Sequence, residues 1–269
     1  MESKTGILKR FINSIYNLDE FPKYVTYGVG KAILYALILS LFIGGIKGTV
    51  KFINVNSYMD EVCSIIDEDE YRFKISDNHL ELENSPVVFE NNKMLFYADE
   101  NVTMDEINDL RKMTVNEDIN FLALKDGLFI KTNGDYDNIG DMNVYYSDMS
   151  IGNQITNSDI ISLIKSSKPM LGIVIIGSYI FQDFFMYILS AFFIAVLTII
   201  PSKLSGVNYR LANLFSLVIY AYTLPNLLVL ILNIIFPDIL FDTAGMIGAM
   251  VYTYLAIRNI RKQINQKVV

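Results

Sequence analysis

Residues 32–43 read Ala-Ile-Leu-Tyr-Ala-Leu-Ile-Leu-Ser-Leu-Phe-Ile, and they form the centre of a longer apolar segment, 27–46. The hydrocarbon core of a membrane, about 30 Å thick, needs about 20 mostly apolar residues in a helix. We therefore expect 27–46 to be a transmembrane helix. A cleaved signal peptide is the less favoured alternative, because the segment begins late and Gly44-Gly45-Ile46-Lys47 is a poor cleavage site.

Three further segments have the same character, at 169–200, 211–236 and 239–257. The first is too long for one crossing at about 1.5 Å per residue, so we expect a stalk followed by a transmembrane helix. Pro225 interrupts the segment 211–236, and since proline removes a backbone hydrogen bond we expect one kinked helix there. A tight turn at Pro237-Asp238 leads into the last segment. The chain is thus expected to be an α-helical membrane protein with about four transmembrane helices.

A different pattern fills residues 47–168, between the first two of these helices. From Lys51 to Lys168 there are ten basic and 23 acidic residues. Short runs alternate between apolar and polar residues around turn-forming residues, which is typical of β-hairpins. Such runs occur at 71–83, 87–97 and 121–130. Thr103 and Glu106 predict a capping box at the start of a helix over 103–112. We expect an acidic extracytoplasmic α+β domain, mostly antiparallel β, inserted between helices one and two.

Lys and Arg predict the orientation, because short loops on the cytoplasmic side of a membrane carry an excess of them. They gather before the first helix, between the second and third, and after the fourth: Lys4, Lys9, Arg10, Lys23, Lys31, Lys203, Arg210, Arg258, Arg261, Lys262 and Lys267. Both termini are therefore expected in the cytoplasm, with 258–269 as a basic tail. Residues 1–26 are expected to form an amphipathic segment on the inner leaflet. The alternative is a helix packed on the bundle.

Three polar side chains fall within the apolar segments at similar depth, about 22–26 Å from the inner end at 1.5 Å per residue. They are Asp183, Asn226 and Asp242. Acids inside a membrane are costly and often functional, so one hypothesis is a cation or proton site, or a polar pocket. The favoured alternative is that both acids meet water at the outer interface, and that Asn226 repairs the backbone freed by Pro225.

Small residues on the last helix predict close helix packing, within the bundle or in a dimer. They are Gly245, Gly248 and Ala249.

Nothing in the sequence predicts a catalytic, cofactor or metal site. There is one cysteine, Cys63, and one histidine, His79, and no phosphate-binding, zinc or redox motif. The acidic run 67–70 and the later Asp135, Asp137 and Asp141 offer oxygen ligands for calcium, but their spacing does not match an EF-hand loop. The favoured interpretation is a solvated acidic surface.

The order of these parts resembles a family of bacterial membrane proteins of unknown function, DUF1189. The matching residues are Lys31 to Tyr35, Phe96 to Asp99, Leu124 to Leu128 and Tyr220 to Pro225. The resemblance covers nearly the whole chain. It implies a protein of the plasma membrane of a Gram-positive bacterium, sometimes labelled as a maltodextrin-utilisation protein, with distant kinship to Yip-type membrane proteins. It implies no catalytic residues.

The function expected from these features is that of a non-enzymatic integral membrane protein. Its external domain would sense or scaffold, as an accessory to another membrane complex such as one for carbohydrate uptake. The alternative is a small transporter or channel that uses Asp183 and Asp242, and a membrane enzyme acting on lipid or glycan ranks third. The expected partners are the lipid bilayer and a membrane protein or a second copy of the chain. No feature indicates nucleic acid.

Overall fold

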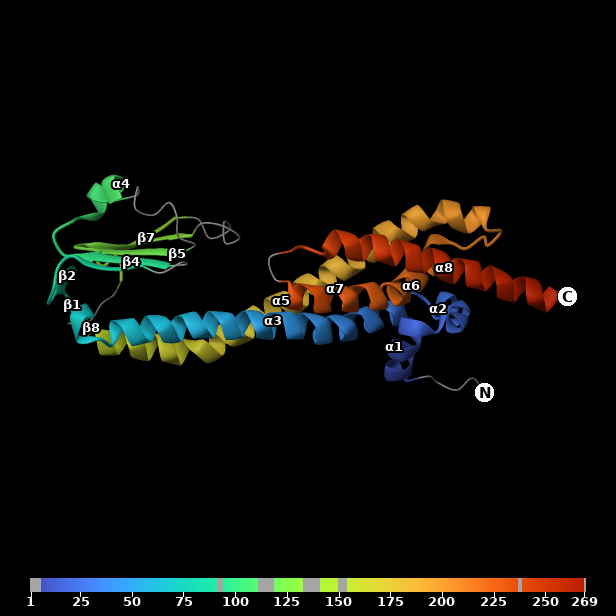
Figure 1. The fold of residues 1–269 in the computed structure, drawn as a ribbon, viewed down its shortest axis with the longest axis horizontal. Helices are drawn as coiled ribbons and strands as arrows, with labels where there is room; N and C mark the ends of the chain where they lie inside the picture. The colour runs from blue at the N-terminus through green and yellow to red at the C-terminus, as the bar shows by residue number, and fades with distance from the viewer. Residues whose placement is uncertain are drawn as a thin grey trace. The chain divides into compact units, whose positions relative to one another are not determined.

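The computed structural model describes residues 6–90, 94–110, 119–132, 141–149, 154–236 and 239–268. The chain divides into two compact units (Figure 1). A helical unit comprises residues 1–53 and 171–269, and a sheet unit comprises residues 54–170. The expected turn at Pro237-Asp238 and the acids Asp135 and Asp137 lie outside the described residues.

Helices account for the first unit. The N-terminal elements are α1 (Ile7–Tyr16), η1 (Leu18–Glu20) and α2 (Phe21–Thr26), and the long helices are α3 (Val29–Ile66) and α5 (Asn157–Leu204). The remaining helices are α6 (Leu211–Ala221), α7 (Thr223–Ile235) and α8 (Asp242–Val268). Buried tyrosines join several of them: Tyr24 stacks on Tyr220 with ring centroids 4.2 Å apart, and the Tyr35 and Thr223 hydroxyls lie 2.8 Å apart.

The segment 211–236, expected to be one helix kinked at Pro225, is divided into two helices. Helix α6 ends at Ala221 and α7 begins at Thr223. Pro225 has no N–H to donate to the carbonyl of Ala221, four residues earlier, so the helical hydrogen-bond pattern is interrupted at this level. The chain resumes at once, since the Asn226 N–H donates to the Tyr222 carbonyl at 3.0 Å.

The expected arrangement of four transmembrane helices is wrong. Among the described residues, three helical segments are long and apolar enough to cross a membrane: Val29–Ile66, Asn157–Leu204 and Leu211–Ile235, the last made of α6 and α7 together. Helix α8 is not long and apolar enough to cross, because only 15 residues separate Asp242 from Arg258. At about 1.5 Å per residue they cover about 22 Å, short of a hydrocarbon core of about 30 Å. The sheet-containing part also differs from the single domain expected, since it forms two sheets that follow α3 and has helix α4 (Ile107–Leu110) between its strands.

The first sheet has three strands in the order β2-β1-β8. They are β1 (Phe73–Ser76), β2 (His79–Leu82) and β8 (Ile155–Thr156), all antiparallel. Asp77 and Asn78 form the β1–β2 turn with φ of 52° and 63°. Two consecutive positive φ values suit a two-residue hairpin turn, and Asn and Asp tolerate them better than most residues. The hairpin predicted at 71–83 is confirmed.

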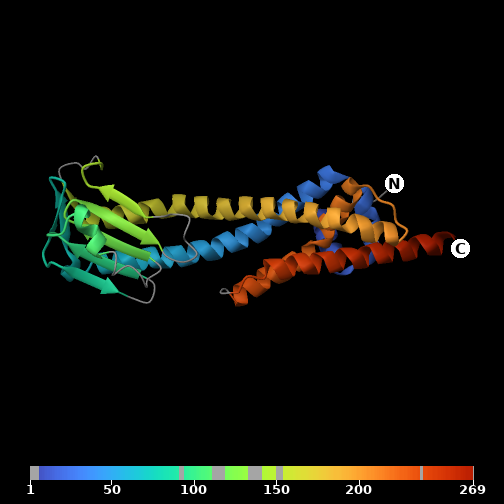
Figure 2. The same ribbon diagram turned by 90° about the horizontal axis from the view of Figure 1, so that it is seen from above.

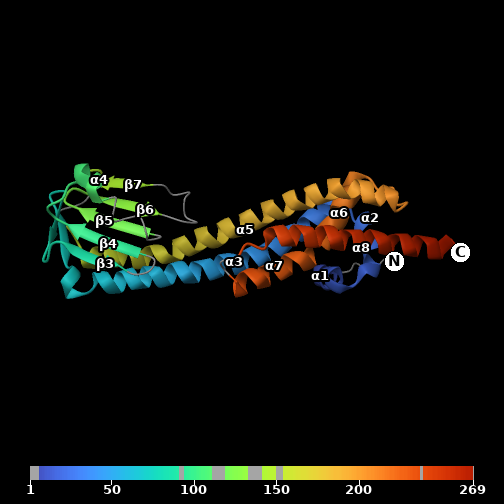
Figure 3. The same cartoon turned by 45° about the horizontal axis from the view of Figure 1, so that its top comes forward.

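The second sheet has five strands in the order β3-β4-β5-β6-β7 (Figures 2 and 3). They are β3 (Val87–Glu90), β4 (Met94–Asp99), β5 (Ile119–Leu124), β6 (Gly127–Thr132) and β7 (Met142–Tyr145). The antiparallel pairs β3–β4 and β5–β6 confirm the two other predicted hairpins. Strands β4 and β5 are parallel, because the chain between them crosses over through η3 (Met104–Glu106) and α4.

The two faces of this sheet pack against different elements. Leu122, Leu124 and Phe129 lie under Met104 and Ile107, at the start of the crossover. The predicted capping box begins it: the Thr103 N–H donates to Glu106 at 2.9 Å. On the other face, side chains from β3 to β6 turn towards the three-stranded sheet.

Asp99 anchors the end of β4. Its carboxylate accepts hydrogen bonds from the Tyr97 hydroxyl at 2.9 Å, the Ser85 hydroxyl at 3.1 Å, and the Asn101 backbone and side-chain N–H groups at 2.9 and 3.2 Å. Burial acts to raise the pKa of Asp99, but these donors together outweigh it and hold the pKa below its ordinary value. Burial and the same contact raise the pKa of Tyr97 to about 12.

Lowering the pH is expected to destabilise the sheet unit through Asp99. Its pKa is lower in the folded chain than in the unfolded chain, where it is about 3.9. The stabilisation is therefore complete above about pH 4 and is lost as the pH falls through the folded value. Asp99→Asn is expected to lower the free energy of unfolding at neutral pH by about 1–3 kcal/mol and to weaken the acid dependence. Calorimetry of the full-length protein in detergent measures both. An acid dependence identical in the variant would contradict this role.

Candidate functional site

Helices α3 and α5 touch backbone to backbone within the helical unit. A Cβ added to Gly44 would lie 2.7 Å from the Cα of Ile180, and one added to Gly48 would lie 2.8 Å from the Cα of Ile176. The two glycines are four residues apart and so lie on one face of α3. We call this contact the α3–α5 seam. Its spacing is the small-xxx-small pattern that brings apolar helices into close contact.

An ion pair crosses the same seam. The Lys47 ammonium lies 3.0 Å from Oδ1 of Asp183, with 24% of the lysine side chain and 7% of the aspartate side chain exposed. The other carboxylate oxygen, Oδ2, is buried and accepts no hydrogen bond from the described residues. Because Lys47 lies between Gly44 and Gly48, the approach of the helices carries the ammonium to the carboxylate.

Two tyrosines connect this region to the break between α6 and α7. Tyr187, one turn along α5 from Asp183, donates its hydroxyl to the carbonyl of Ile219 at 2.6 Å. Its ring stacks on Tyr222 with centroids 4.9 Å apart. The charges of Asp242 and Asp183 both act on the hydroxyl group of Tyr222. The polar groups therefore gather around the proline-induced break.

The three predicted polar residues have different surroundings. Asp183 pairs with Lys47 across the seam. Asn226 is buried beside the helix break, and Asp242 is exposed at the first residue of α8. Within the described part of the chain no hydrogen bond or ion pair joins these three residues to each other. The described residues therefore show no single site made of all three. The electrostatic effect of Asp183 and Asp242 on Tyr222 is a link between two of them.

The predicted packing residues of α8 lie against α7. A Cβ added to Gly245 would lie 2.6 Å from Cγ2 of Val229, and one added to Gly248 would lie 3.5 Å from the ring of Pro225. Ala249 is fully buried. Helix α8 thus contacts the element that carries the kink.

Sequence reasoning overlooked the seam and the partner of Asp183. The signal was present, since Gly44-Gly45-Ile46-Lys47-Gly48 contains two glycines four apart within an apolar helix. The expected first transmembrane helix, 27–46, ends before Lys47. The structure continues α3 to Ile66, so Lys47 lies inside the helix.

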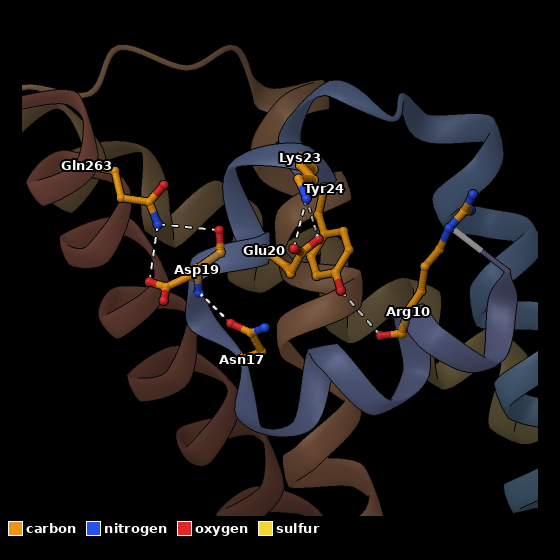
Figure 4. Close-up of polar contacts among 7 residues, drawn as sticks. All are labelled: Arg10, Asn17, Asp19, Glu20, Lys23, Tyr24 and Gln263. Atoms are coloured by element: carbon orange, nitrogen blue, oxygen red, sulfur yellow. Dashed lines mark hydrogen bonds and ion pairs between the residues drawn. The ribbon is translucent and has the colours of Figure 1, made fainter. Parts of the chain in front are cut away.

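A second polar cluster joins the two ends of the chain (Figure 4). Asp19 accepts hydrogen bonds from the side chain of Asn259 at 2.8 Å and from that of Gln263 at 3.3 Å. The Tyr252 hydroxyl donates to the carbonyl of Ile15 at 2.8 Å. The N-terminal helices and the C-terminal half of α8 therefore pack together.

Among the residues that the structure describes, no group of three His, Cys, Asp or Glu side chains is placed to hold a metal ion. A comparison with protein families finds one described as "Protein of unknown function (DUF1189)", which matches residues 8–257. Comparisons with curated proteins and with solved structures find no match.

Alanine substitution along α3 tests the seam. Gly44→Ala and Gly48→Ala are each expected to lower the free energy of unfolding by about 1–3 kcal/mol, because the added methyl groups force the helices apart. Gly45→Ala is the matched control, since a Cβ there meets no atom within 4 Å. It is expected to be neutral, or stabilising by up to about 1 kcal/mol through helix propensity. Thermal unfolding in detergent measures all three, and equal effects would contradict the seam.

Paired substitutions test the ion pair. Lys47→Met leaves the Asp183 carboxylate buried without its cation and is expected to cost up to about 3–5 kcal/mol. Lys47→Met combined with Asp183→Leu replaces both charges by apolar groups and is expected to recover most of that loss. Unfolding free energies of the single and double variants measure this. A double variant as unstable as Lys47→Met alone would show that the pairing is not what Asp183 needs.

Proposed function

The chain belongs to the DUF1189 family of proteins of unknown function, and from this membership we propose that it is a non-enzymatic integral membrane protein that is accessory to another membrane complex. In this proposal the sheet unit senses or scaffolds a partner outside the cytoplasm. A complex for carbohydrate uptake is one such partner. The helical unit holds the protein in the bacterial plasma membrane.

The observation that carries the proposal is the course of α3 and α5. Each is a single helix that supplies residues to both units: α3 runs from Val29 to Ile66, and α5 from Asn157 to Leu204. Both are long and apolar enough to cross a membrane. A binding event at the sheet unit would act directly on two membrane helices without an intervening flexible linker. This arrangement suits a sensing or scaffolding part.

Two observations support an orientation with both termini in the cytoplasm. Outside the segment 51–168, most basic residues lie before the first apolar segment, between the second and third, and after the last, as expected for cytoplasmic segments. The contacts of Asp19 with Asn259 and Gln263 join the two ends of the chain to each other. Together they favour one side of the membrane for both termini and the opposite side for the sheet unit.

Helix α1 supports contact with the lipid surface. It buries Asn13 and Ser14 and exposes four of its apolar residues, Ile7, Leu8, Ile12 and Tyr16, with Leu8 73% and Tyr16 69% exposed. A helix of a water-soluble protein has the reverse arrangement. An exposed apolar face next to Lys9 and Arg10 suits a helix that lies in the membrane interface.

The alternative function is transport of a cation or proton through the Asp183 region. Oδ2 of Asp183, which accepts no hydrogen bond from the described residues, favours it, and so does the action of two acidic charges, Asp183 and Asp242, on Tyr222. The ion pair with Lys47 weighs against it, because a bound ammonium already neutralises the carboxylate. We therefore rank it second.

Site-specific photo-cross-linking tests the accessory role. Strand β3 is an edge of the five-stranded sheet and Val88 on it is 54% exposed, so a partner could reach it directly. A photoreactive residue at Val88 in the full chain is expected to give an adduct with one membrane protein. The same residue at Ile264, exposed near the C-terminus of α8, is the control and is expected to lack that adduct.

A pull-down with a tag after Val269 measures the same partner without cross-linking. Recovery of one protein in comparable amount supports the accessory role. Recovery of the chain alone, together with no adduct at Val88, would contradict it. In that case, loss of proton or cation flux in Asp183→Asn and Asp242→Asn would favour transport.

A further inference from the structure

The sheet unit encloses an apolar cavity of about 280 Å³. Its walls come from four places: both sheets, the last turns of α3 and the first turns of α5. Phe73 and Leu80 belong to the three-stranded sheet, Ala98 and Ala123 to the five-stranded sheet, Ile65 to α3 and Ile164 to α5. The volume approaches the lower end of the range for small-molecule sites, roughly 300–1,000 Å³.

The cavity exists because the sheet places two small side chains together. Ala98 of β4 and Ala123 of β5 are direct neighbours in the parallel pair, and Phe96 and Phe121 are neighbours two residues earlier. Alternate residues of a strand share a face, so all four point to the cavity side. The residues between them, Tyr97 and Leu122, belong to the packed core on the opposite face. The two alanines thus form one wall of a space that no side chain of the described residues fills.

The lining is suited to hydrocarbon and to nothing charged. Its side chains are aliphatic or aromatic apart from Met149, and the only polar side-chain groups among them are the hydroxyls of Tyr71 and Tyr146. Protein interiors are normally packed without voids larger than a water molecule. A cavity of this size that offers water few partners stays dry, and an empty one lowers stability. An apolar occupant removes that cost.

A polar hollow on the other face of the three-stranded sheet does not supply a headgroup site. Its lysine and arginine, Lys74 and Arg72, are paired with Glu81 and Asp69, and the hollow also contains Asp67 and Glu83. A carboxylate or phosphate would meet an excess of acids there. Recognition is therefore confined to an uncharged chain.

We propose that this cavity binds the alkyl chain of a lipid. The helices that wall it, α3 and α5, are two of the three described helices that are long and apolar enough to cross a membrane, so lipid is within reach of the chain. Met149 marks the entrance, because it lines the cavity and is also 37% exposed. Its unbranched side chain moves aside at little cost. The site goes beyond the accessory role and does not depend on it.

Photoaffinity labelling of the full-length protein in detergent tests the site. The probes are a fatty acid and a phospholipid, each with a photoreactive group at the end of an alkyl chain. Labelled peptides are expected from β4, β5 and the first turns of α5. Labelling by the fatty acid alone identifies a free fatty acid as the source, and labelling by both identifies the chain as the only requirement. Label confined to apolar segments of the helical unit would overturn the proposal.

Cavity-filling variants provide the matched comparison. Ala98→Leu with Ala123→Leu is expected to reduce labelling of the sheet unit at least tenfold while the thermal unfolding midpoint stays the same or rises. Ala123→Val is the milder second variant, should the double one fail to fold. Val88→Leu, which adds a methylene to an exposed position next to the lining residue Val87, is the control and is expected to label as the wild type does.

Unchanged labelling in a folded, cavity-filled variant would overturn the proposal, and so would stabilisation by filling with no labelling of the wild type. Either result leaves the cross-linking at Val88 unaffected. Failure of this site is thus distinguishable from failure of the accessory role.

Discussion

The contact on which the helical unit most depends is the meeting of two backbones at Gly44 and Gly48. Because neither residue has a side chain, α3 approaches α5 more closely than it could with any other residue type at positions 44 and 48. That approach brings the Lys47 ammonium to the Asp183 carboxylate. A buried ion pair adds little net stability, since desolvation offsets much of the attraction. Its contribution is to specify alignment, because sliding one helix along the other would leave a charge unpaired among apolar side chains.

In the five-stranded sheet, side chains alternate between the two faces along each strand. The two faces therefore pack in different ways. On one face large side chains pack against the η3–α4 crossover. On the other face Ala98 and Ala123 lie side by side and leave the apolar cavity, which the three-stranded sheet covers. Asn157 holds this second layer to the helices: its side chain donates to the carbonyl of Tyr71 at 2.9 Å and accepts from the N–H of Phe73 at 2.8 Å. The first residue of α5 is therefore hydrogen-bonded to the segment that leads into β1.

Local features of the sequence predicted local structure well. Asp77 and Asn78 predicted one hairpin, Thr103 and Glu106 a capping box, and Pro225 an irregularity in its helix, although as a kink and not as the observed division into α6 and α7. In each case neighbouring residues determine the geometry. Properties that need a rotation about a helix or a distant partner were missed. Depth along a helix placed Asp183, Asn226 and Asp242 at one level but could not say which way each points. The prediction of a fourth transmembrane helix was wrong because it rested on the apolar composition of 239–257. The number of residues between the charges of Asp242 and Arg258 is too small for a membrane crossing. The cavity could not be foreseen, since Ala98 and Ala123 are neighbours only after β4 and β5 pair in parallel.

The central position of β1 has a consequence for the order of events during synthesis. Its partner β2 follows within a few residues, but its other partner, β8, comes about 80 residues later, with Lys74 opposite Thr156 and Ile75 opposite Ile155. Until that segment leaves the ribosome, β1 presents an open edge that can pair with another chain. The apolar part of α3 emerges before any strand, and that of α5 only after all of them. The three-stranded sheet can therefore be completed only once the segment directly before α5 has emerged, after the apolar part of α3 has already left the ribosome.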